Sequence, residues 1–359
     1  MPEPTKHLVV PNFTRITRVY FDEIVRPTFS KVARNTIPIR KNYCIGGNKI
    51  CLSFYSEQLL QKLSHALMHL EGEAVEKPDL TVHLWDSVST KTSIPSPFEH
   101  TSHQFILETQ TNTEITDQFL GIFLSGEQTL NLYDTKNRTA YFWTRDANLL
   151  PDWLSAAPIR PILHWFLSRS NIHLIHGAVI GVDDRAVLLS AKGGSGKSTT
   201  AIASVLAGMN YLGDDYVGIE SGKTIVAHSL YNSAKVDDRT IAQFPLLKKH
   251  IVNPNHKPED KAIVFFSEIL EAQVKQHASL AAILIPRIID GASTRIIPAT
   301  KLEAMLALTP TTLFQLPLAG THQLSALKRI IEKTPCYILE LGLPIENVPN
   351  VIKTVLCLP

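Results

Sequence analysis

The sequence feature that most constrains the fold is the stretch AKGGSGKST at positions 191–199. A short apolar run, residues 186–190, comes directly before it and is typical of a buried strand. After the stretch, Ile202, Val205 and Leu206 recur at helical spacing. The sequence therefore predicts a strand, a glycine-rich loop and a helix in direct succession.

A loop of this composition can bind phosphate. Its glycines let consecutive backbone N–H groups turn toward one anion, and the following helix directs the positive end of its dipole to the same place. Lys197 would reach the β- and γ-phosphates of a nucleotide, and the Ser198 hydroxyl would bind Mg²⁺. Ala191 replaces the first glycine of the pattern G-x-x-x-x-G-K-[ST], which is the mildest substitution available. The expected nucleotide-binding residues are Gly193, Gly194, Ser195, Gly196, Lys197, Ser198 and Thr199.

Length and charge exclude several classes of protein. The 359 residues allow one large domain, but a chain of this length more often forms two, and we expect two. The net charge of +2 comes without a long basic tract, so nucleic acid is not an expected partner. No apolar stretch reaches the length of a membrane span, and the first residues lack the basic start and apolar core of a signal peptide. We therefore expect a cytoplasmic protein that does not bind a membrane.

Neither the cysteines nor the histidines form a metal-binding pattern. His173 and His176 lie on one expected strand, residues 173–182, where side chains three positions apart face opposite sides. The cysteines form two distant pairs without CxxC spacing, which indicates reduced thiols and no disulfide or zinc site. These cysteines are Cys44, Cys51, Cys336 and Cys357.

Residues 1–150 are predicted to form an α+β domain for recognition of a substrate or partner, or to cap the other half. Alternating patterns predict strands, helical spacing predicts a helix, and two β-rich runs around a polar turn predict a hairpin. A segment rich in Ser, Thr and Pro predicts a loop. The strands are 48–54 and 80–85, the helix is 59–70, the hairpin joins 129–133 to 139–143, and the loop is 87–103.

Residues 151–359 are predicted to form an α/β domain around the glycine-rich loop. A helical segment, residues 151–170, leads into it. Strands then alternate with helices, which indicates a sheet covered by helices. The expected strands are 173–182, 186–190, 211–219, 281–286 and 336–341, and the expected helices are 200–209, 300–308, 322–333 and 345–356.

Two adjacent acids, Asp214 and Asp215, interrupt the apolar strand 211–219. Burying an acid without a partner is costly, and short connections keep this strand near the loop. Mg²⁺, a substrate hydroxyl or Lys197 would each satisfy such a carboxylate, and the alternative is a solvated turn. Two polar segments follow. We expect residues 228–235 to form an exposed loop or a contact to phosphate or substrate, and residues 253–261 to form a mobile flap.

The order of these motifs resembles a known family. His176-Gly177, then the loop, then Asp214-Asp215-Tyr216-Val217 is similar to the catalytic domain of HPr kinase, in particular to diverged HPr-kinase-like proteins that include kinases of serine in peptides. The similarity is tight over residues 172–220 and loose over the rest of the second half. It implies a P-loop kinase domain of the HPr kinase/PEP carboxykinase type at 151–359.

The resemblance also implies roles for individual residues. Lys197 and Ser198 would bind the triphosphate of ATP and Mg²⁺. Asp214 would be the general base for the acceptor hydroxyl, Asp215 would support the metal or orient that base, and His176 would line the site and relay a proton. The implied activity is phosphoryl transfer from ATP to a hydroxyl, on Ser or Thr of a peptide or protein or on a small-molecule alcohol.

Two differences from HPr kinase bear on the substrate. The family has an acidic residue directly after the loop serine, where this chain has Thr199. The family's second glycine-rich signature, which is tied to the reverse phosphorylase activity and to hexamer contacts, has no match here. We therefore expect neither a bifunctional enzyme nor HPr as the acceptor, and a homo-oligomer stays open.

Two other functions are compatible with the loop. KGGSGKS at residues 192–198 also resembles the variant loop of ParA- and MinD-type ATPases, in which the first lysine acts across a dimer. That reading predicts a nucleotide switch without phosphoryl transfer to an acceptor. A nucleotide-binding regulatory protein that has lost transfer is the third possibility.

Overall fold

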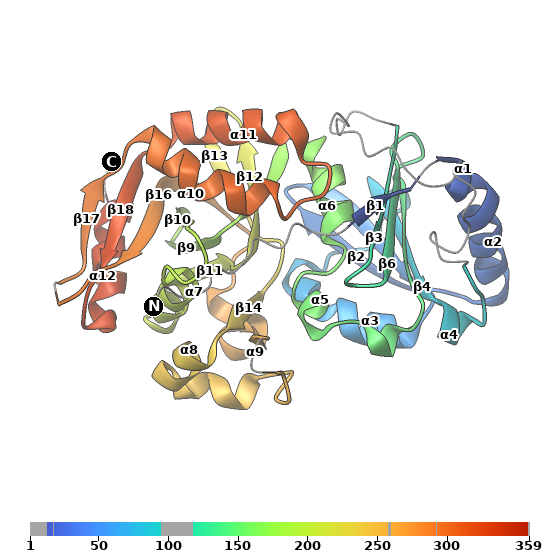
Figure 1. The fold of residues 1–359 in the computed structure, drawn as a ribbon, viewed down its shortest axis with the longest axis horizontal. Coiled ribbons are helices and arrows are strands. Elements are labelled where there is room, and N and C mark those ends of the chain that lie inside the picture. The colour runs from blue at the N-terminus through green and yellow to red at the C-terminus, as the bar shows by residue number, and fades with distance from the viewer. Residues whose placement is uncertain (1–12, 17, 95–117, 258–259, 292, 358–359) are drawn as a thin grey trace, which may run out of the picture.

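The computed structural model describes residues 13–16, 18–94, 118–257, 260–291 and 293–357. They form a mixed α/β fold with several sheets, and Figure 1 shows the two large sheets lying beside each other with helices around them. The first sheet lies in the N-terminal half of the chain and the second lies in the C-terminal half.

The first sheet has the strand order β1-β5-β6-β7-β4-β3-β2 within the described residues. Its central strands β3, β4 and β7 are parallel neighbours, and the other pairs are antiparallel. Its strands are β1 (Phe13–Arg15), β2 (Ile39–Ile45), β3 (Asn48–Phe54), β4 (Leu80–Asp86), β5 (Phe119–Leu124), β6 (Thr129–Asp134) and β7 (Thr139–Thr144). The expected strands at 48–54 and 80–85 and the hairpin β6–β7 are confirmed.

Short helices accompany this sheet. They are α1 (Arg18–Tyr20), α2 (Arg26–Asn35), α3 (Glu57–Leu63) and α4 (Ser87–Thr90). The helix expected at 59–70 is α3 followed by a separate 3₁₀ helix, His65–Leu70. The loop expected at 87–103 begins instead with α4, and its residues 95–103 lie outside the described part of the chain. The helical segment expected at 151–170 is confirmed as α5 (Asp152–Ala156) and α6 (Arg160–Ser168).

The second sheet has the order β11-β9-β10-β16-β13-β12-β8 among the described residues, and β18 joins it beside β16 and β17. Strands β10, β16 and β18 are parallel, so their carboxyl ends meet at one edge of the sheet. Its strands are β8 (Ile172–His176), β9 (Ala178–Val182), β10 (Arg185–Leu189), β11 (Asn210–Gly213), β12 (Tyr216–Ser221), β13 (Ile225–His228), β16 (His277–Ile288), β17 (Arg295–Pro298) and β18 (Cys336–Leu341).

Helices cover both faces of the second sheet because its buried strands are apolar on both sides. Val187 and Leu189 of β10 pack in the core shared with α7 and α12, whereas Ala186 and Leu188 pack in the core shared with α10 and α11. This alternation follows from the two-residue period of a strand. The helices are α7 (Lys197–Leu206), α10 (Lys301–Leu313), α11 (Gly320–Lys333) and α12 (Val348–Leu356), in agreement with the expected helices.

The single strand expected at 173–182 is wrong, because the chain changes partners at Gly177. Before it, β8 pairs with β12, and after it, β9 pairs with β10 and β11. A β-carbon at Gly177 would lie 2.9 Å from the carbonyl oxygen of Leu189, so the close approach requires glycine. The strand expected at 211–219 is likewise two strands, β11 and β12, separated by the acid pair.

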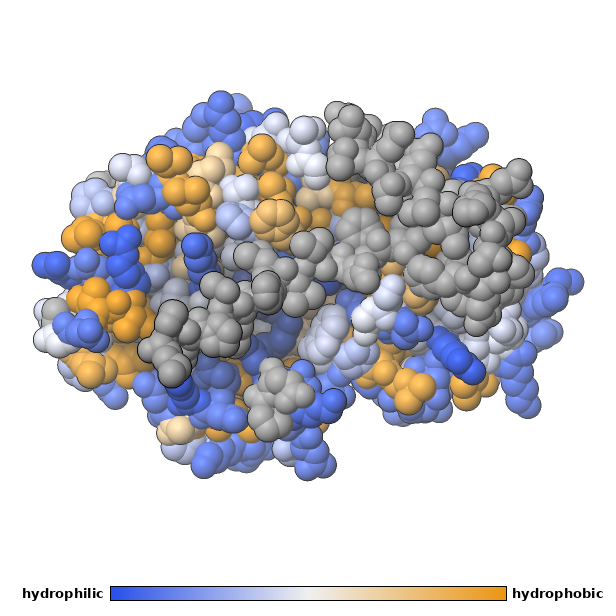
Figure 2. Space-filling view, in the orientation of Figure 1, coloured by the Kyte–Doolittle hydropathy of each residue, from blue (hydrophilic) through white to orange (hydrophobic). Residues whose placement is uncertain are grey.

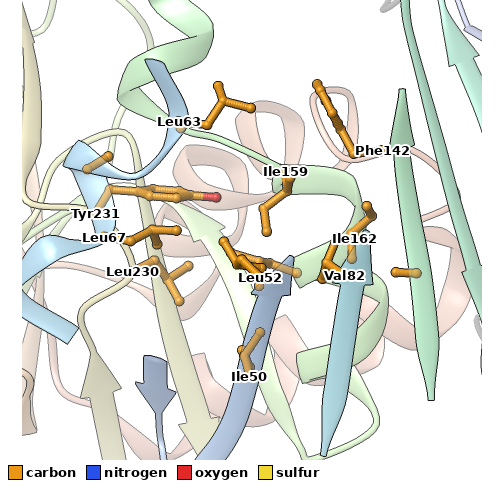
Figure 3. Packing of buried hydrophobic residues seen from close by; sticks show 14 of the residues in the cluster. Ile50, Leu52, Leu63, Leu67, Val82, Phe142, Ile159, Ile162, Leu230 and Tyr231 are labelled. Atoms are coloured by element: carbon orange, nitrogen blue, oxygen red, sulfur yellow. The ribbon is translucent and has the colours of Figure 1, made fainter. Parts of the chain in front are cut away.

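The exposed loop considered for residues 228–235 is not observed. Leu230, Tyr231 and Asn232 are buried, and Figure 3 shows Leu230 and Tyr231 among side chains of the first sheet and its helices. The Tyr231 hydroxyl donates to the Pro158 carbonyl at 2.9 Å, and the Asn232 amide donates to the Ala66 carbonyl at 2.9 Å. One hydrophobic core therefore runs across the expected boundary at residue 150, and the division into two domains stays a prediction.

A small subdomain lies below the second sheet in Figure 1. It contains a two-stranded sheet and short helices. Its elements are β14 (Ser233–Val236), α8 (Asp238–Gln243), β15 (Ala262–Phe265) and α9 (Phe266–Ile269). The flap expected at 253–261 connects to β15, and its residues 258–259 lie outside the described part of the chain. The four cysteines are free, as expected.

Candidate active site

A cavity of about 490 Å³ opens at the carboxyl ends of β10, β16 and β18. The whole glycine-rich loop, from Ala191 to Thr199, lines it. Asp215, which follows β11, pairs with His176 and Lys235 on the side of β10 where β9 and β11 lie, and β16 and β18 end on the other side of β10. Parallel strands place their following loops together, which explains why segments far apart in sequence meet here.

The loop conformation suits an anion. Gly194 and Gly196 have φ angles of 81° and 89°, in the left-handed region that glycine adopts without strain. Within the described residues, the amide groups of residues 191–196 donate no hydrogen bond to a protein oxygen. Helix α7 starts directly after Gly196 and has no side-chain cap at its N-terminus. The helix start and the loop thus present free N–H groups and a positive dipole end to the cavity.

The loop lysine is held by the first acid of the pair. Lys197 Nζ donates to Asp214 Oδ1 at 2.6 Å, and the Asp215 amide donates to the same oxygen at 2.9 Å. Asp214 is 2% exposed and does not line the cavity. The acid therefore has the partner that its burial requires, and the solvated-turn alternative does not describe it.

The second acid lines the cavity. Asp215 has a φ of 75°, a left-handed conformation that is uncommon for a residue with a side chain. Its Oδ1 lies 3.3 Å from Nε2 of His176, and its Oδ2 forms an ion pair with Lys235. The carbonyl of Asp215 accepts a hydrogen bond from the Gly177 amide at 3.1 Å. The break between β8 and β9 thus holds the turn that carries both acids.

Electrostatic interactions fix the charge of these groups. Burial alone would raise the pKa of Asp215, but Lys235, His176 and Lys197 outweigh it and hold that pKa well below its usual range. Burial alone would lower the pKa of Lys197, yet the two carboxylates raise it above the ordinary value. Burial lowers the pKa of His176 despite the bond to Asp215. At neutral pH the site holds an ionised Asp215, a charged Lys197 and a neutral His176.

A second layer of side chains lies behind Asp215. Arg160 Nη1 donates to the Tyr216 hydroxyl at 3.2 Å, and that hydroxyl donates to Gln315 Oε1 at 2.6 Å. Arg160 Nη2 also lies 3.6 Å from Glu127 Oε1, in the turn between β5 and β6 of the first sheet. The residue next to Asp215 is therefore connected to both halves of the chain.

The subdomain of β14 and α8 supplies another wall. Asp237, Arg239, Thr240 and Lys261 line the cavity there, and all but Thr240 are exposed. Thr240 Oγ1 lies 2.8 Å from the hydroxyl of Thr199, which attaches this wall to the start of α7. The wall is polar and carries more positive than negative charge, as expected of a surface that faces anions.

The structure brings most of the predicted site residues together. The loop residues, His176 and Asp215 all line the cavity, whereas Asp214 lies behind Lys197. His173 points elsewhere: its Nδ1 lies 3.3 Å from Gln323 Oε1 in the buried core. Lys192, the lysine of the switch alternative, is exposed at the cavity.

Sequence reasoning missed several residues of the cavity. Lys235 belonged to a segment considered for phosphate contact, but no pattern singled it out as the partner of Asp215. Arg239 and Lys261 lie in polar segments without a motif. Ile288 ends β16 and Leu343 follows β18, both as ordinary apolar residues. These residues meet only because the β14–α8 subdomain, which the chain inserts between β13 and β16, contributes to the lining of the cavity, and no local pattern shows this.

The polar groups of the cavity fit Mg²⁺ and a nucleoside triphosphate. Ser198 and Asp215 both line the cavity, and hydroxyl and carboxylate oxygens are ligands that Mg²⁺ prefers. The Ser195 hydroxyl is buried and has no partner among the described residues, so a donor of the loop is left for an anion. No group of three His, Cys, Asp or Glu side chains in the described ranges could hold a metal ion by itself.

Comparisons with known proteins give little further information. No protein-family model matches the chain, and no curated protein sequence does. Among solved structures, the chain is similar to the Hpr(Ser) kinase/phosphatase from Coxiella burnetii, with a TM-score of 0.28 and 11% sequence identity over 51% of this chain and 93% of that chain. A likeness at this level carries no argument about function. The family expected from the sequence motifs stays a prediction.

Among the described residues, no helix is both long and apolar enough to cross a bilayer. The expected cytoplasmic location stays a prediction.

Proposed function

We propose that the protein is a kinase that transfers the γ-phosphoryl group of a nucleoside triphosphate, ATP in the first place, to a hydroxyl group. The observation that carries the proposal is the cavity in which an uncapped α7 and its glycine-rich loop face the ionised carboxylate of Asp215. An anion cradle and a carboxylate on the same cavity are the parts that phosphoryl transfer requires.

In the proposed reaction, the loop amides and Lys197 bind the β- and γ-phosphates. Lys197 leaves Asp214 or is shared between it and the phosphates, and Asp214 keeps the lysine at its position. The acceptor oxygen attacks the γ-phosphorus, the bond from that phosphorus to the β-phosphate oxygen breaks, and the nucleoside diphosphate leaves. Mg²⁺, held by Ser198 when bound, would neutralise charge on the β- and γ-phosphates.

The proton of the acceptor hydroxyl passes to Asp215 in this proposal. That assignment differs from the sequence-based one, in which Asp214 is the base and Asp215 supports the metal. We prefer Asp215 because it lines the cavity, while Asp214 is buried against Lys197. A low pKa does not disqualify it, since the hydroxyl proton leaves late in a loose transition state. His176 and Lys235 orient the carboxylate.

The proposed acceptor is Ser or Thr of a peptide or protein. The motif order His176-Gly177, loop and acid pair favours this class, and the polar wall of Arg239 and Lys261 is exposed where an acceptor would approach.

The experiment that tests the function is transfer of labelled γ-phosphate from ATP into a lysate of the source cell. Wild type is compared with Asp215→Asn and Asp214→Asn, and labelled species are identified by mass spectrometry. We expect Asp215→Asn to keep ATP affinity within a few-fold and to lose transfer by about 10³-fold. Unchanged transfer in this variant would remove Asp215 from the mechanism and return the base role to Asp214.

The switch alternative rests on Lys192, which is exposed at the cavity. Under that alternative, ATP is hydrolysed without any labelled acceptor, and Lys192→Ala abolishes hydrolysis and nucleotide-dependent dimerisation. Under the kinase proposal, Lys192→Ala leaves labelling of the acceptor within about tenfold of wild type, since a lysine outside the transferring group contributes one exposed charge. The two functions therefore give opposite results for the same variant.

A further inference from the structure

Two kinds of side chain line the cavity. Asp215, Lys235, Arg239 and Lys261 are charged. A second set is apolar, and we call it the strand-end wall because it lies at the ends of β16 and β18 and in the segments that follow them. It consists of Ile288, Ile289, Leu341, Leu343, Ile345 and Val348. The sheet order places β16 and β18 on one side of β10, and β9 and β11, which leads into the acid pair, on the other side. One bound molecule can therefore reach from the wall past the glycine-rich loop to the charged groups.

The pairing of two strands creates the wall. Strands β16 and β18 run parallel with Ile288 opposite Leu341, so both chains leave the sheet at the same edge. Ile288 is 62% exposed and Leu343 is 75% exposed. In Figure 2, hydrophobic residues gather on the left of the molecule, over the region where Figure 1 places β18 and α12. Large exposed apolar side chains grouped at a cavity indicate a contact surface for a ligand.

The wall is continuous with the phosphate loop. Leu341 Cδ1 lies 2.7 Å from the position that a β-carbon at Gly196 would take, and Ile288 Cγ1 lies 3.7 Å from it. A group bound on the wall would therefore lie next to the start of α7. A nucleoside attached to phosphates in the loop has this arrangement, since its base is a flat apolar ring joined to the phosphates through one sugar.

Part of the backbone of the wall is already hydrogen-bonded within the protein. The Ile289 amide donates to the Leu341 carbonyl at 3.1 Å. The amide and carbonyl of Gly342 are both bonded to the Thr294 hydroxyl, at 3.1 and 3.2 Å. Asp290, a charged residue that follows Ile289 in sequence, also lines the cavity and is exposed. Recognition here therefore depends on apolar contact more than on polar groups that distinguish one base from another.

We propose that the strand-end wall binds the base of a purine nucleotide by apolar contact and accepts adenine and guanine alike. This inference rests on the proposed nucleotide-dependent function and adds the direction of the bound nucleotide. With the base against Ile288 and Leu343, the triphosphate runs along the loop, and its γ-phosphate points to Asp215. The wall is thus the part of the site that fixes which end of the nucleotide faces the acceptor.

Calorimetric titration of the full chain with ATP, GTP and tripolyphosphate, each with Mg²⁺, tests the proposal. In wild type we expect ATP and GTP to bind within about fivefold of each other and at least about tenfold more tightly than tripolyphosphate, as apolar burial of a ring predicts. The double variant Ile288→Ser/Leu343→Ser should weaken both nucleotides by about tenfold and leave tripolyphosphate binding unchanged.

The matched control is Leu302→Ser/Leu306→Ser on α10, where the leucines are 67% and 60% exposed and do not line the cavity. It should bind all three ligands as wild type does, and circular dichroism checks that both double variants are folded. Equal affinities of wild type for ATP and tripolyphosphate would overturn the proposal that the strand-end wall binds the base, and so would an unchanged ATP affinity in the Ile288→Ser/Leu343→Ser variant. Neither result would overturn the nucleotide-dependent function. Failure of wild type to bind any of the three would overturn the nucleotide function together with this inference.

Discussion

The two large sheets each contain a parallel strand that runs into a helix, and the two junctions differ in one respect. After β3, the start of α3 is closed by its own chain, because Ser56 Oγ accepts from the Leu59 amide at 3.3 Å. After β10, the start of α7 follows Gly196, which has no side chain to offer. The comparison teaches that strand-loop-helix order alone does not leave the amides of a helix start free for an anion. The helix start must also be left without an acceptor.

The sharpest way to break this comparison is to give α7 a cap. Gly196→Ser should lower ATP affinity by about 100-fold, because the serine hydroxyl would offer an acceptor to the free amides at the start of α7, and the φ of 89° strains any residue with a side chain. Fluorescence titration with a labelled ATP measures the change. Gly208→Ser is the control: it has a φ of 87° just beyond the other end of α7, in open space, and should bind ATP normally. Equal affinities of Gly196→Ser and wild type would contradict the role given to the open helix start.

The next largest effect concerns the ion pair at the open junction. Asp214→Asn leaves the buried Lys197 without its anion and should cost about 3 kcal/mol of unfolding free energy. Saturating ATP should restore most of this loss, because phosphates replace the carboxylate. Urea denaturation with and without ATP measures both. Asp86→Asn is the matched change in the first sheet, where the Asp86 carboxylate caps α4. Asparagine also caps helices, so this variant should lose less unfolding free energy, and ATP should not alter that loss. An Asp214→Asn deficit that ATP leaves untouched would show that Lys197 does not meet the phosphates.

A pH dependence separates the two regions further. Burial lowers the pKa of His176, so the unfolded chain takes up a proton near pH 6.5 before the folded chain does, and stability falls as the pH drops through that value. His176→Gln should remove the contribution of this histidine to the slope of unfolding free energy against pH, which is at most about 1.4 kcal/mol per pH unit. Denaturation at pH 7.5, 6.5 and 5.5 measures it.

His83 in the first sheet is the comparison for that slope, since burial and Arg40 lower its pKa to about 4. It has the same sign of pH dependence, but it lies on β4, away from the cavity. ATP should therefore change the slope contributed by His176 and leave that of His83 as it is. An identical response of both histidines to ATP would argue against a nucleotide beside His176.

The smallest expected effect is at the closed junction. Ser56→Ala removes the cap of α3 and should cost about 1 kcal/mol of stability, while Ser56→Asp should keep most of it. Neither variant should change ATP affinity, because α3 has no part in the cavity. Thermal unfolding and ATP titration of the two variants measure this. A change in ATP affinity after Ser56→Ala would mean that the two junctions are coupled.

Local patterns were sufficient for much of the fold and for the strand, glycine-rich loop and helix of residues 185–206. The loop after β10 carries its own signal, since glycines, Lys197 and Ser198 act through positions adjacent in sequence. The hairpin β6–β7 and the helices α7 and α11 follow from periodicity in the same way.

Other features depend on distant partners, and no local pattern shows them. The apolar run 173–182 is continuous in sequence, yet Gly177 breaks it because the Leu189 carbonyl lies close by. Alternation along a strand could not tell which acid faces the cavity, since Asp215 takes a left-handed conformation that interrupts the alternation. Leu230 and Tyr231 are buried by helices more than sixty residues earlier in the chain, so composition alone did not separate them from an exposed loop.

The core that runs across residue 150 has a practical consequence. The segment that brings Lys235 to the cavity also carries Leu230 and Tyr231 into the first half, so a truncated chain that begins at residue 151 would expose this apolar surface and aggregate. Ligand screening therefore requires the intact chain. The intact chain also contains its own fluorescent reporters, Trp85 and Trp143, which are buried in the first half. Their intrinsic fluorescence should show a melting temperature that rises when a ligand occupies the distant cavity.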